Sequence, residues 1–344
     1  MKKIFITGIC GFVGSNLAHY FYSKGYKVYG IDNLSRKGTE KNLNLLRKNG
    51  IVVFRKNLAE LKKFDLIKKK NSFKAVIHCA GLTSVLDGTN KNTTDFIYKN
   101  NILSTLNSLK ICNTLKSKYI YISSSRVYNI SKINELKFKV AQNGFKLKKN
   151  KTKGISSKGI NEDFSTEAPL SFYGSSKLMS ENMIKEFCLF KKIPFIINRC
   201  GLLAGSGQFY KSDQGIISYW INSWKSNREL KFIGFGSKGH QVRDCLHPLD
   251  LANLINKQMS SLKKGIRKKF IFNVSGGITS AFSLKDLSLW CEKEIYSKKV
   301  KSQKIIRPFD LKWIVLDNTK VRKTFNWKIN FTKYKIFDDI NLND

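Results

Sequence analysis

The sequence predicts an α/β fold in which a doubly wound parallel β-sheet is followed by a smaller C-terminal α/β lobe. Short apolar runs typical of buried strands alternate with segments whose apolar residues recur at helical spacing. A glycine-rich turn, residues 8–14, separates the first run from the first helical segment. After about residue 202 the alternation becomes less regular, and glycine and aromatic residues interleave. The pattern therefore predicts one regular sheet domain and a second lobe.

The first fourteen residues are typical of a phosphate-binding unit. Residues 4–6 read as a buried strand, and Phe12 and Val13 open a helix that extends to residue 23. Three glycines follow the strand at a spacing of three: Gly8 and Gly11 precede the helix, and Gly14 lies in its first turn. A phosphate needs bare backbone N–H groups at a helix N-terminus, and a side chain at Gly8 or Gly11 would hold it away. The turn therefore predicts a Rossmann-type dinucleotide site.

The second strand, residues 26–31, ends in Asp32, eighteen residues after the last glycine of the turn. An acid at this place can accept both hydroxyls of an adenosine ribose and repels a 2′-phosphate, which favours NAD over NADP. Two basic residues shortly after Asp32, Arg36 and Lys37, favour NADP instead. We expect Asp32 and its neighbour Asn33 to contact the cofactor.

Later elements continue the alternation. The sequence predicts helices over residues 41–48, 95–116 and about 171–190. It predicts further strands over residues 51–54, 75–79, 119–122 and 193–199. The glycine turn, Asp32, Ala80-Gly81 and the serine run 123–125 all follow such strands. Ligands bind at these C-terminal strand ends in open parallel sheets, so one shared site is expected.

Domain boundaries follow from the same regularity. Residues 1–200 are predicted to form the NAD-binding Rossmann domain. Within it, residues 129–165 are rich in lysine with little periodicity, and we expect an insert or flap there. Residues 201–344 are predicted to form mainly the substrate lobe, with some segments returning to the first domain.

Composition narrows the classes of function. The 344 residues are 42% hydrophobic, enough for a packed core, and 63 Lys+Arg against 24 Asp+Glu give a net charge of +39. The basic residues are spread along the chain rather than gathered in a stripe, so we expect no nucleic-acid partner. No apolar run reaches the ~18 residues that span a bilayer, which predicts no membrane segment. Seven scattered cysteines without a C-x-x-C pair are typical of reduced cytoplasmic thiols and predict no metal site.

A tyrosine and a lysine at helical spacing predict an acid–base site. Tyr173 and Lys177 are four residues apart, on one face of a predicted helix. A tyrosine with its ordinary pKa of ~10 is a poor base at neutral pH, and an ammonium one turn away is expected to lower that pKa. The order along the chain supports this interpretation, because the glycine turn and Ser124 precede the pair.

With these motifs, the chain resembles the extended short-chain dehydrogenase/reductase family, specifically its sugar-nucleotide epimerases and dehydratases. The resemblance rests on Thr7-Gly-x-x-Gly-Phe-x-Gly14, Ser124 in S-S-S-x-V-Y, Tyr173-x-x-x-Lys177, Asn101 and Gln-Val-Arg243-Asp. It implies that the catalytic residues are Ser124, Tyr173 and Lys177. It also implies that the cofactor contacts include, besides the turn and Asp32, five further residues: Asn57, Leu58, Ala80, Gly81 and Asn101.

A closer resemblance is to CDP-paratose (CDP-tyvelose) 2-epimerase-like proteins. It is carried by Asp32-Asn-Leu-Ser-Arg-Lys-Gly38, Gln208-Phe209, Asp213-Gln-Gly215, Gly239-His-Gln-Val-Arg243 and Phe272-Asn-Val-Ser-Gly-Gly277. It implies a CDP- or UDP-sugar held by Ser124, Gln208, Gln214, Arg243 and Arg307, in a homodimer or homotetramer. Two positions depart from the family pattern: Asn57 replaces an acid that contacts adenine, and Asn129 replaces a glycine.

The position after the catalytic serine separates the activities within the family. Its 4,6-dehydratases carry an Asp-Glu pair there, and the UDP-glucuronate decarboxylases keep the Glu, whereas this chain has Ser125 and Arg126. The missing carboxylates favour an epimerase that oxidises a sugar transiently with NAD and returns the hydride. A UDP-sugar 4-epimerase, a net NAD(P)-dependent reductase and a non-enzymatic nucleotide- or RNA-binding protein stay open as alternatives.

Overall fold

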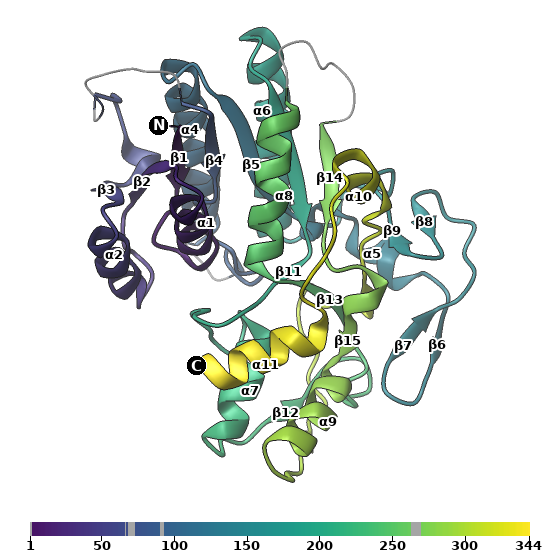
Figure 1. The fold of residues 1–344 in the computed structure, drawn as a ribbon. Coiled ribbons are helices and arrows are strands. Elements are labelled where there is room, and N and C mark those ends of the chain that lie inside the picture. Colours follow the sequence, from purple (N-terminus) through teal and green to yellow (C-terminus); the bar gives the residue numbers. More distant parts are fainter. Residues whose placement is uncertain (1, 66, 68–72, 90–92, 263–269) are drawn as a thin grey trace.

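A computed structural model describes residues 2–65, 67, 73–89, 93–262 and 270–344. Its centre is a seven-stranded sheet in the order β14-β10-β5-β4-β1-β2-β3, in which every neighbouring pair is parallel (Figure 1). The strands are β1 (Lys3–Thr7), β2 (Lys27–Asp32), β3 (Val52–Arg55), β4 (Ala75–His78), β5 (Lys118–Ser124), β10 (Phe195–Cys200) and β14 (Ile271–Val274). The strand order reverses between β1 and β4, as in doubly wound dinucleotide-binding folds, so the predicted fold class is confirmed.

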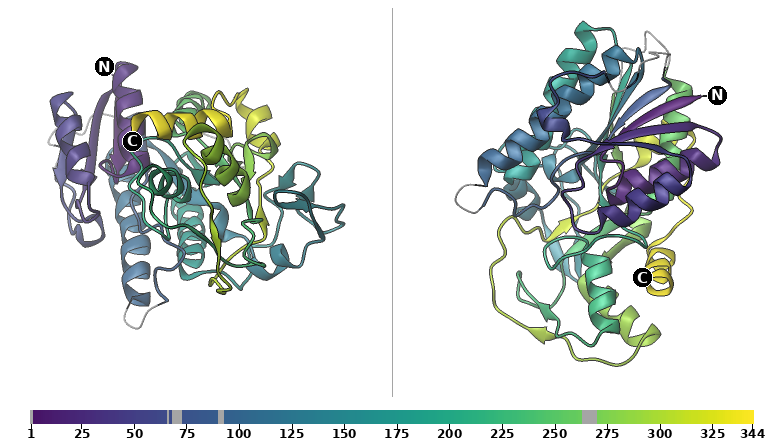
Figure 2. Two further views of the ribbon diagram at one scale, coloured as in Figure 1. Left: turned by 90° about the horizontal axis from the view of Figure 1, so that it is seen from below. Right: turned by 90° about the vertical axis from the view of Figure 1, so that its left-hand side faces the viewer.

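Helices cover both faces of this sheet (Figure 2). One face carries α1 (Phe12–Ser23), α2 (Thr39–Lys48), α8 (Pro248–Ser261) and α10 (Thr319–Phe325). The other carries α4 (Ser104–Thr114) and α6 (Phe172–Phe190). Alternate residues of a strand point to opposite faces of the sheet. In β1, Ile4 and Ile6 pack in the core on one face, and Phe5 packs in the core on the other. Strands buried on both faces explain the short, wholly apolar runs in the sequence.

The second lobe lies beyond the C-terminal ends of the sheet strands (Figure 1). Its small mixed sheet contains β11 (Leu202–Leu203), β13 (Val242–Leu246), β15 (Ala281–Ser283) and β17 (Trp313–Ile314), with a separate pair β12 (Lys231–Phe232) and β16 (Lys301–Ser302). Its helices are α7 (Ile216–Lys225), α9 (Leu284–Glu294) and α11 (Lys333–Asn343), and the turn η4 covers Ile278–Ser280. Trp224 and Phe337 are among the largest side chains of its own apolar core.

The lysine-rich segment 129–165 is a small structured layer. It contains α5 (Ile130–Asn134) and two hairpins, β6 (Phe138–Val140) with β7 (Phe145–Leu147), and β8 (Ile155–Ser156) with β9 (Gly159–Ile160). Figure 1 shows both hairpins at the right-hand edge of the molecule. Phe138 and Phe145 pack against Trp313 and His240 of the second lobe. The segment is therefore apolar on one side, and its lysines occupy the outer side.

The helix predicted over residues 95–116 is confirmed, with one irregular turn inside it. The structure has α3 (Thr94–Tyr98), a π-helical turn η2 (Lys99–Leu103) and then α4, without a gap between them. Within the turn, the Asn101 side chain accepts a hydrogen bond from Leu82 N at 2.8 Å and donates one to Ser176 Oγ at 2.8 Å. A π turn inserts an extra residue into the helical ladder and is common at functional sites. The sequence pattern did not predict this turn, at which Asn101 contacts residues distant in the chain.

No helix in the described part of the chain is long and apolar enough to cross a lipid bilayer. The seven cysteines carry free thiols, and all except Cys79 are buried. Burial raises the pKa of the Cys200 thiol to about 12, so it stays protonated at neutral pH. A protonated thiol is a weak nucleophile, so we assign this cysteine no covalent chemistry.

A buried ion pair joins α6 to the sheet. Arg199 of β10 donates three hydrogen bonds of 2.8–3.2 Å to the carboxylate of Glu181 in α6. The two side chains are 5% and 0% exposed. The same carboxylate accepts a 2.6 Å hydrogen bond from Ser123 of β5. One carboxylate therefore fixes the middle of α6 against two neighbouring strands.

We expect Glu181→Gln to destabilise the protein by about 3–5 kcal/mol, because it leaves the Arg199 guanidinium buried without its counter-charge. Denaturant unfolding followed by circular dichroism measures the loss. The matched control is Glu167→Gln, which removes a solvent-exposed pair with Lys132 and should leave the midpoint unchanged. Equal midpoints for the two variants would show that the buried pair contributes nothing to stability.

Candidate active site

A cleft of about 460 Å³ opens at the C-terminal ends of the sheet strands and extends to the second lobe. All but one of the residues predicted for the site line it: Gly8, Gly11, Phe12, Val13, Gly14, Asp32, Asn33, Asn57, Leu58, Ala80, Gly81, Ser124, Tyr173, Lys177, Gln208, Gln214, Arg243 and Arg307. The exception is Asn101. The predicted residues come from both lobes. Folding therefore brings together residues as distant in the chain as Gly8 and Arg307, which are 299 positions apart.

The glycine turn at one end of the cleft suits a pyrophosphate. Gly8 has φ +66°, and a Cβ added there would lie 2.8 Å from the Ala80 backbone. A Cβ on Gly14 would lie 2.1 Å from the Gly8 carbonyl oxygen, so only glycine lets α1 start this close to the turn. Gly11 is the N-cap of α1 and offers no side chain to the first helical N–H groups. Those groups are thus available to an anion, as a bound dinucleotide requires.

Asp32 lies at the end of β2 beside this turn. Its two carboxylate oxygens accept hydrogen bonds from Cys10 N at 2.9 Å and Leu34 N at 2.8 Å. Burial raises the pKa of Asp32, and these backbone donors oppose the rise. Each oxygen keeps a lone pair for a ribose hydroxyl. Nearby, Asn57 Oδ1 accepts a hydrogen bond from Ala59 N at 3.1 Å and caps the turn η1 (Leu58–Glu60). At this position, where the family pattern has an acid, a side-chain amide therefore shapes the wall of the cleft.

Asn101 acts from behind the cleft wall. Its side chain holds the backbone of Leu82, directly after Gly81, and a Cβ on Gly81 would approach Asn101 Oδ1 to 2.9 Å. Gly81 has φ +147°, a conformation that a residue with a side chain rarely adopts. The structure therefore gives Asn101 a supporting position for the loop after β4 rather than a place at the cleft surface.

Ser124, Tyr173 and Lys177 meet at the centre of the cleft. Ser124 ends β5, and its Oγ accepts a hydrogen bond from Arg126 N at 3.1 Å, which caps the turn η3 (Ser125–Val127). Tyr173 and Lys177 come from the first turns of α6, whose N-cap is Ser171. The Lys177 ammonium donates to Ile122 O at 3.1 Å and lies 4.8 Å from the centroid of the Tyr121 ring. All three side chains are almost fully buried.

Burial dominates the electrostatics of Tyr173. It raises the pKa of this tyrosine to about 12, and a hydrogen bond with Ser124 and the charge of Arg126 oppose the rise. Burial also lowers the pKa of Lys177 to about 8. The lowering of the tyrosine pKa by Lys177 together with the nicotinamide ring concerns the site with NAD bound and stays a prediction.

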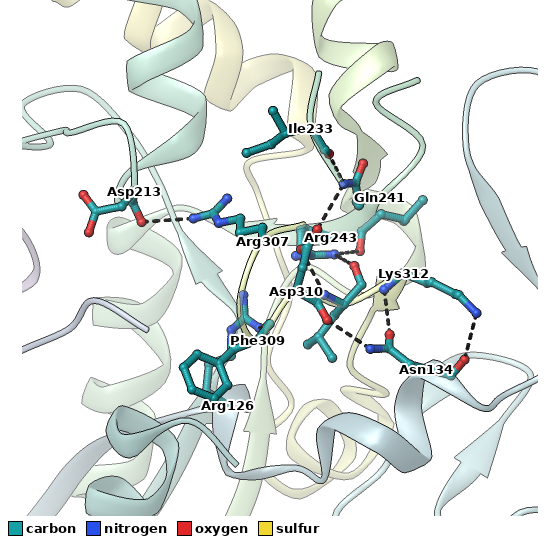
Figure 3. A network of polar contacts seen from close by, with 12 residues as sticks. Arg126, Asn134, Asp213, Ile233, Gln241, Arg243, Arg307, Phe309, Asp310 and Lys312 are labelled. Atoms are coloured by element: carbon teal, nitrogen blue, oxygen red, sulfur yellow. Dashed lines mark hydrogen bonds and ion pairs between the residues drawn. The ribbon is translucent and has the colours of Figure 1, made fainter. Parts of the chain in front are cut away.

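The far end of the cleft carries three arginines around one acid (Figure 3). Arg243 of β13 pairs with Asp310 at 3.0 Å, and Gln241 donates to the same carboxylate at 3.1 Å. Arg307 Nη2 reaches the Asp213 carbonyl at 3.5 Å. Arg126 Nη1 donates to the Phe309 carbonyl at 3.1 Å. Within the described residues, only Arg243 of the three has a carboxylate partner, so this end attracts anions.

Loops of the two lobes meet over the cleft. Ser84, in the loop after β4, donates a 2.7 Å hydrogen bond to the Asp213 carboxylate. Gln214 bonds to Thr83, and Arg36 donates to the Phe209 carbonyl, with its guanidinium 5.9 Å from the centroid of that ring. These contacts form a clasp, defined by Arg36, Thr83 and Ser84 on one side and Phe209, Asp213 and Gln214 on the other. Gln208 is held within the second lobe by Leu203 O at 3.0 Å and Ser218 Oγ at 3.3 Å.

Comparison with known proteins decides the family. Residues 4–275 match the NAD dependent epimerase/dehydratase family. The chain belongs to this family. It is an enzyme of the NAD-dependent sugar-nucleotide epimerase/dehydratase class, and NAD is its cofactor. The match confirms the family, the enzyme class and the cofactor that the motifs predict, and the turn, Asp32 and α1 provide a fitting site.

Individual relatives share the fold over nearly the whole chain. The chain is 27% identical over 331 residues to a CDP-paratose 2-epimerase from Salmonella typhi, covering 94% of each protein. It is 22% identical over 350 residues to a UDP-glucose 4-epimerase from Rhizobium meliloti, covering 95% of this chain and 92% of that one. A crystal structure of a UDP-glucuronic acid 4-epimerase from Bacillus cereus superposes with a TM-score of 0.78 at 22% identity, covering 99% and 98% of the two chains.

Sequence reasoning missed three parts of this family member's site. Arg126 was noted only as a replacement for a carboxylate, although its guanidinium lines the cleft and bonds to Phe309 O. Asp310 was not predicted. It follows Arg307 in the run Arg307-Pro-Phe-Asp310, and an acid this close to a predicted site residue was the signal that could have identified it. Arg36 was read as a sign of a 2′-phosphate, whereas its guanidinium bonds to the second lobe. No local pattern reports that last contact.

We expect Ser84→Ala to speed release of NAD roughly tenfold, because it removes the hydrogen bond that this hydroxyl donates to the Asp213 carboxylate across the clasp. The 3.1 Å hydrogen bond from Leu86 N to the same hydroxyl is lost as well. Ser84 does not line the cleft, so the variant leaves the cofactor's own contacts intact. Stopped-flow displacement of bound NAD measures the rate. The control is Thr89→Ala, which removes a hydroxyl whose hydrogen bond among the described residues goes to Leu86 O of its own loop. A release rate equal to that of the control would rule out the clasp.

Proposed function

We propose that the protein is a nucleotide-sugar epimerase that oxidises a sugar hydroxyl transiently and restores it with inverted configuration. The supporting observation is the convergence of Ser124, Tyr173 and Lys177 on the cleft that also contains the dinucleotide turn. When bound, NAD supplies the acceptor that takes a hydride from a sugar carbon and gives it back. The absence of a carboxylate at Ser125 and Arg126 supports epimerisation over elimination, since no nearby base removes a carbon-bound proton there.

Each catalytic residue has a distinct task in this proposal. The Tyr173 phenolate accepts the proton of the sugar hydroxyl at its Oη and returns it at the end of the cycle. Ser124 can donate its hydroxyl proton to the same substrate oxygen, while its own oxygen accepts a hydrogen bond from Arg126 N. Lys177 holds its ammonium on Ile122 O beside the loop at Gly81, from where it can also bind a ribose hydroxyl.

The arginine-rich end of the cleft is proposed to hold the diphosphate. A nucleoside diphosphate carries two negative charges, and guanidinium groups bind phosphate oxygens in bidentate geometry. Arg243 is positioned for this by Asp310, which bonds one edge of its guanidinium at 3.0 Å. Arg307 lines the same end of the cleft, three residues before Asp310 in the chain. Gln208 and Gln214 are proposed to contact the substrate from the α7 side.

We propose CDP-paratose or CDP-tyvelose as the first substrates to test, with epimerisation at C2. The support is the 27% identity, over 94% of both chains, to a protein named CDP-paratose 2-epimerase. A UDP-sugar 4-epimerase is the second candidate, favoured by curated relatives with that name, such as the one from Rhizobium meliloti. We also propose that the protein is a homodimer or a homotetramer and that it acts in the cytoplasm.

Tyr173→Phe should abolish turnover, with a fall of at least about a thousandfold in kcat, because the ring then has no oxygen to accept the proton. NAD should stay bound, since the turn, Asp32 and Lys177 are unchanged. The measurements are NMR of sugar-nucleotide conversion and the NAD content of the purified variant. Near-normal turnover would refute the assignment of Tyr173, and loss of NAD as well would point to a structural defect.

The small molecules carried by the purified protein identify the substrate class directly. Denaturing the protein and analysing the released compounds by mass spectrometry should give NAD together with a CDP- or UDP-sugar. A panel of sugar nucleotides followed by NMR then locates the inverted carbon. NADH that accumulates in proportion to product would replace the epimerase with a net oxidoreductase.

A further inference from the structure

The Lys177 ammonium is charged and buried at the same time. The residue is only 4% exposed, and burial lowers its pKa to about 8. Among the residues that the structure describes, it forms no ion pair with a carboxylate, and Glu181, one helical turn later in α6, is bonded to Arg199. Burial therefore opposes the positive charge that the proposed mechanism needs, and a group near the ammonium must stabilise it.

The ring of Tyr121 is the aromatic partner of this ammonium. Lys177 Nζ lies 4.8 Å from the ring centroid, within the ~6 Å at which the electron-rich face of an aromatic ring attracts a cation. Ile122 O, in the next residue of β5, accepts a 3.1 Å hydrogen bond from the same nitrogen. Burial raises the pKa of Tyr121, so its hydroxyl stays protonated and the ring is neutral. Two consecutive residues of β5 thus fix the position of the ammonium.

His78 of β4 supports the Tyr121 ring. The imidazole and the phenol ring are nearly parallel, with centroids 5.5 Å apart and an interplanar angle of 19°. His78 is 0% exposed, and burial, together with the charge of Lys177, lowers its pKa well below the ordinary value. The imidazole is therefore neutral, and it supports the ring without repelling the lysine.

Two threonine hydroxyls fix the plane of His78 and its tautomer. Thr105 Oγ1 lies 2.7 Å from Asn101 O, and a carbonyl only accepts, so the threonine donates its proton there. The threonine oxygen therefore accepts a 3.1 Å hydrogen bond from His78 Nε2. In the neutral ring this leaves Nδ1 as the acceptor for the Thr7 hydroxyl at 2.6 Å. Because Thr7 directly precedes the glycine turn, the ring pair is tied to the strand that begins the cofactor site.

We propose that Tyr121 is a positioning residue for the reaction, which holds the Lys177 ammonium in place and in its charged form through the face of its ring. The inference rests on the proposed function in that a charged Lys177 must assist Tyr173 as the base. Tyr121 is not among the described residues that line the cleft, so it acts through Lys177 rather than on a ligand.

The other titratable groups around this pair come from β4, β10 and α6. They are His78, Cys79, Cys200, Tyr173 and Glu181. Burial raises the pKa of both thiols to about 12, so they stay neutral while Lys177 titrates. The base is the one group whose ionisation is expected to depend on Lys177, so the titration is performed in a Tyr173→Phe background.

The first test measures the pKa of Lys177 in the NAD-loaded protein without substrate. Lysine side chains are isotope-labelled for NMR, and the signal of Lys177 is the one that Lys177→Met removes. Tyr121→Leu should lower this pKa by about one unit, because an apolar side chain desolvates the ammonium without attracting it. Tyr121→Phe keeps the ring and should stay within about 0.3 units of the native value. An unchanged pKa in Tyr121→Leu overturns the proposal.

Tyr119→Leu is the matched control. Tyr119 lies two residues earlier in β5 and packs in the same buried core. Its hydroxyl bonds to Ser108, and no cation lies over its ring in the part of the chain that the structure describes. The variant should lower the thermal midpoint as Tyr121→Leu does, yet leave the pKa of Lys177 unchanged. An equal pKa shift in both variants would be a general effect of a loosened core and would overturn the proposal.

Fluorinated phenylalanines at position 121 test the attraction with little change of shape. Each added fluorine withdraws electrons from the face of the ring and weakens its attraction for a cation. The pKa of Lys177 should therefore fall stepwise from phenylalanine through the mono-, di- and trifluoro rings. A constant pKa along this series overturns the proposal. Because the ring stays in place, the series gives an answer even where Tyr121→Leu fails to fold.

The last test is the pH profile of kcat with the sugar nucleotide identified for the native enzyme. Lys177 must be charged, so activity falls as pH rises through its pKa, and a lower pKa moves this alkaline limb to lower pH. Tyr121→Leu should move the limb down by about one unit with KM nearly unchanged, and Tyr121→Phe should restore it. An unmoved limb overturns the role of Tyr121 in the reaction. A native enzyme that converts no sugar nucleotide refutes the proposed function instead, and the NMR titration still stands.

Discussion

The carboxylate of Glu181 is the constraint on which the rest of the site depends. It lies one helical turn after Lys177 and binds Arg199 of β10 and Ser123 of β5 in the protein interior. Because α6 contributes both Tyr173 and Lys177, the depth and rotation of that helix decide where the base meets the substrate. A buried ion pair with this many hydrogen bonds has one good geometry, so it specifies position as much as it contributes stability.

Burial of the catalytic groups opposes the charged forms that the proposed reaction uses. A dry cleft strengthens every hydrogen bond to a developing charge, but burial also raises the pKa of Tyr173 and lowers the pKa of Lys177. The nicotinamide ring of bound NAD would add positive charge at this place, beside the Lys177 ammonium.

The sequence predicted what local patterns determine and missed what distant contacts determine. Alternating apolar runs gave the sheet, and the glycine spacing gave the turn, because strand burial and backbone approach leave a trace in neighbouring residues. The π turn at Asn101 and the contact of Arg36 with Phe209 involve segments far apart in the chain. The burial that raises the pKa of Tyr173 is likewise a tertiary property, which the spacing of Tyr173 and Lys177 does not report.

The chain's large positive charge can attract a ligand only where the charged groups are close together and lack acidic partners. Most of the +39 is spread over lysines on the surface, where water and salt screen it. In the cleft, Arg126, Arg243 and Arg307 repel one another at close range, and Asp310 neutralises only part of that charge. A dianionic ligand would relieve this repulsion, so these three arginines favour a substrate with a diphosphate.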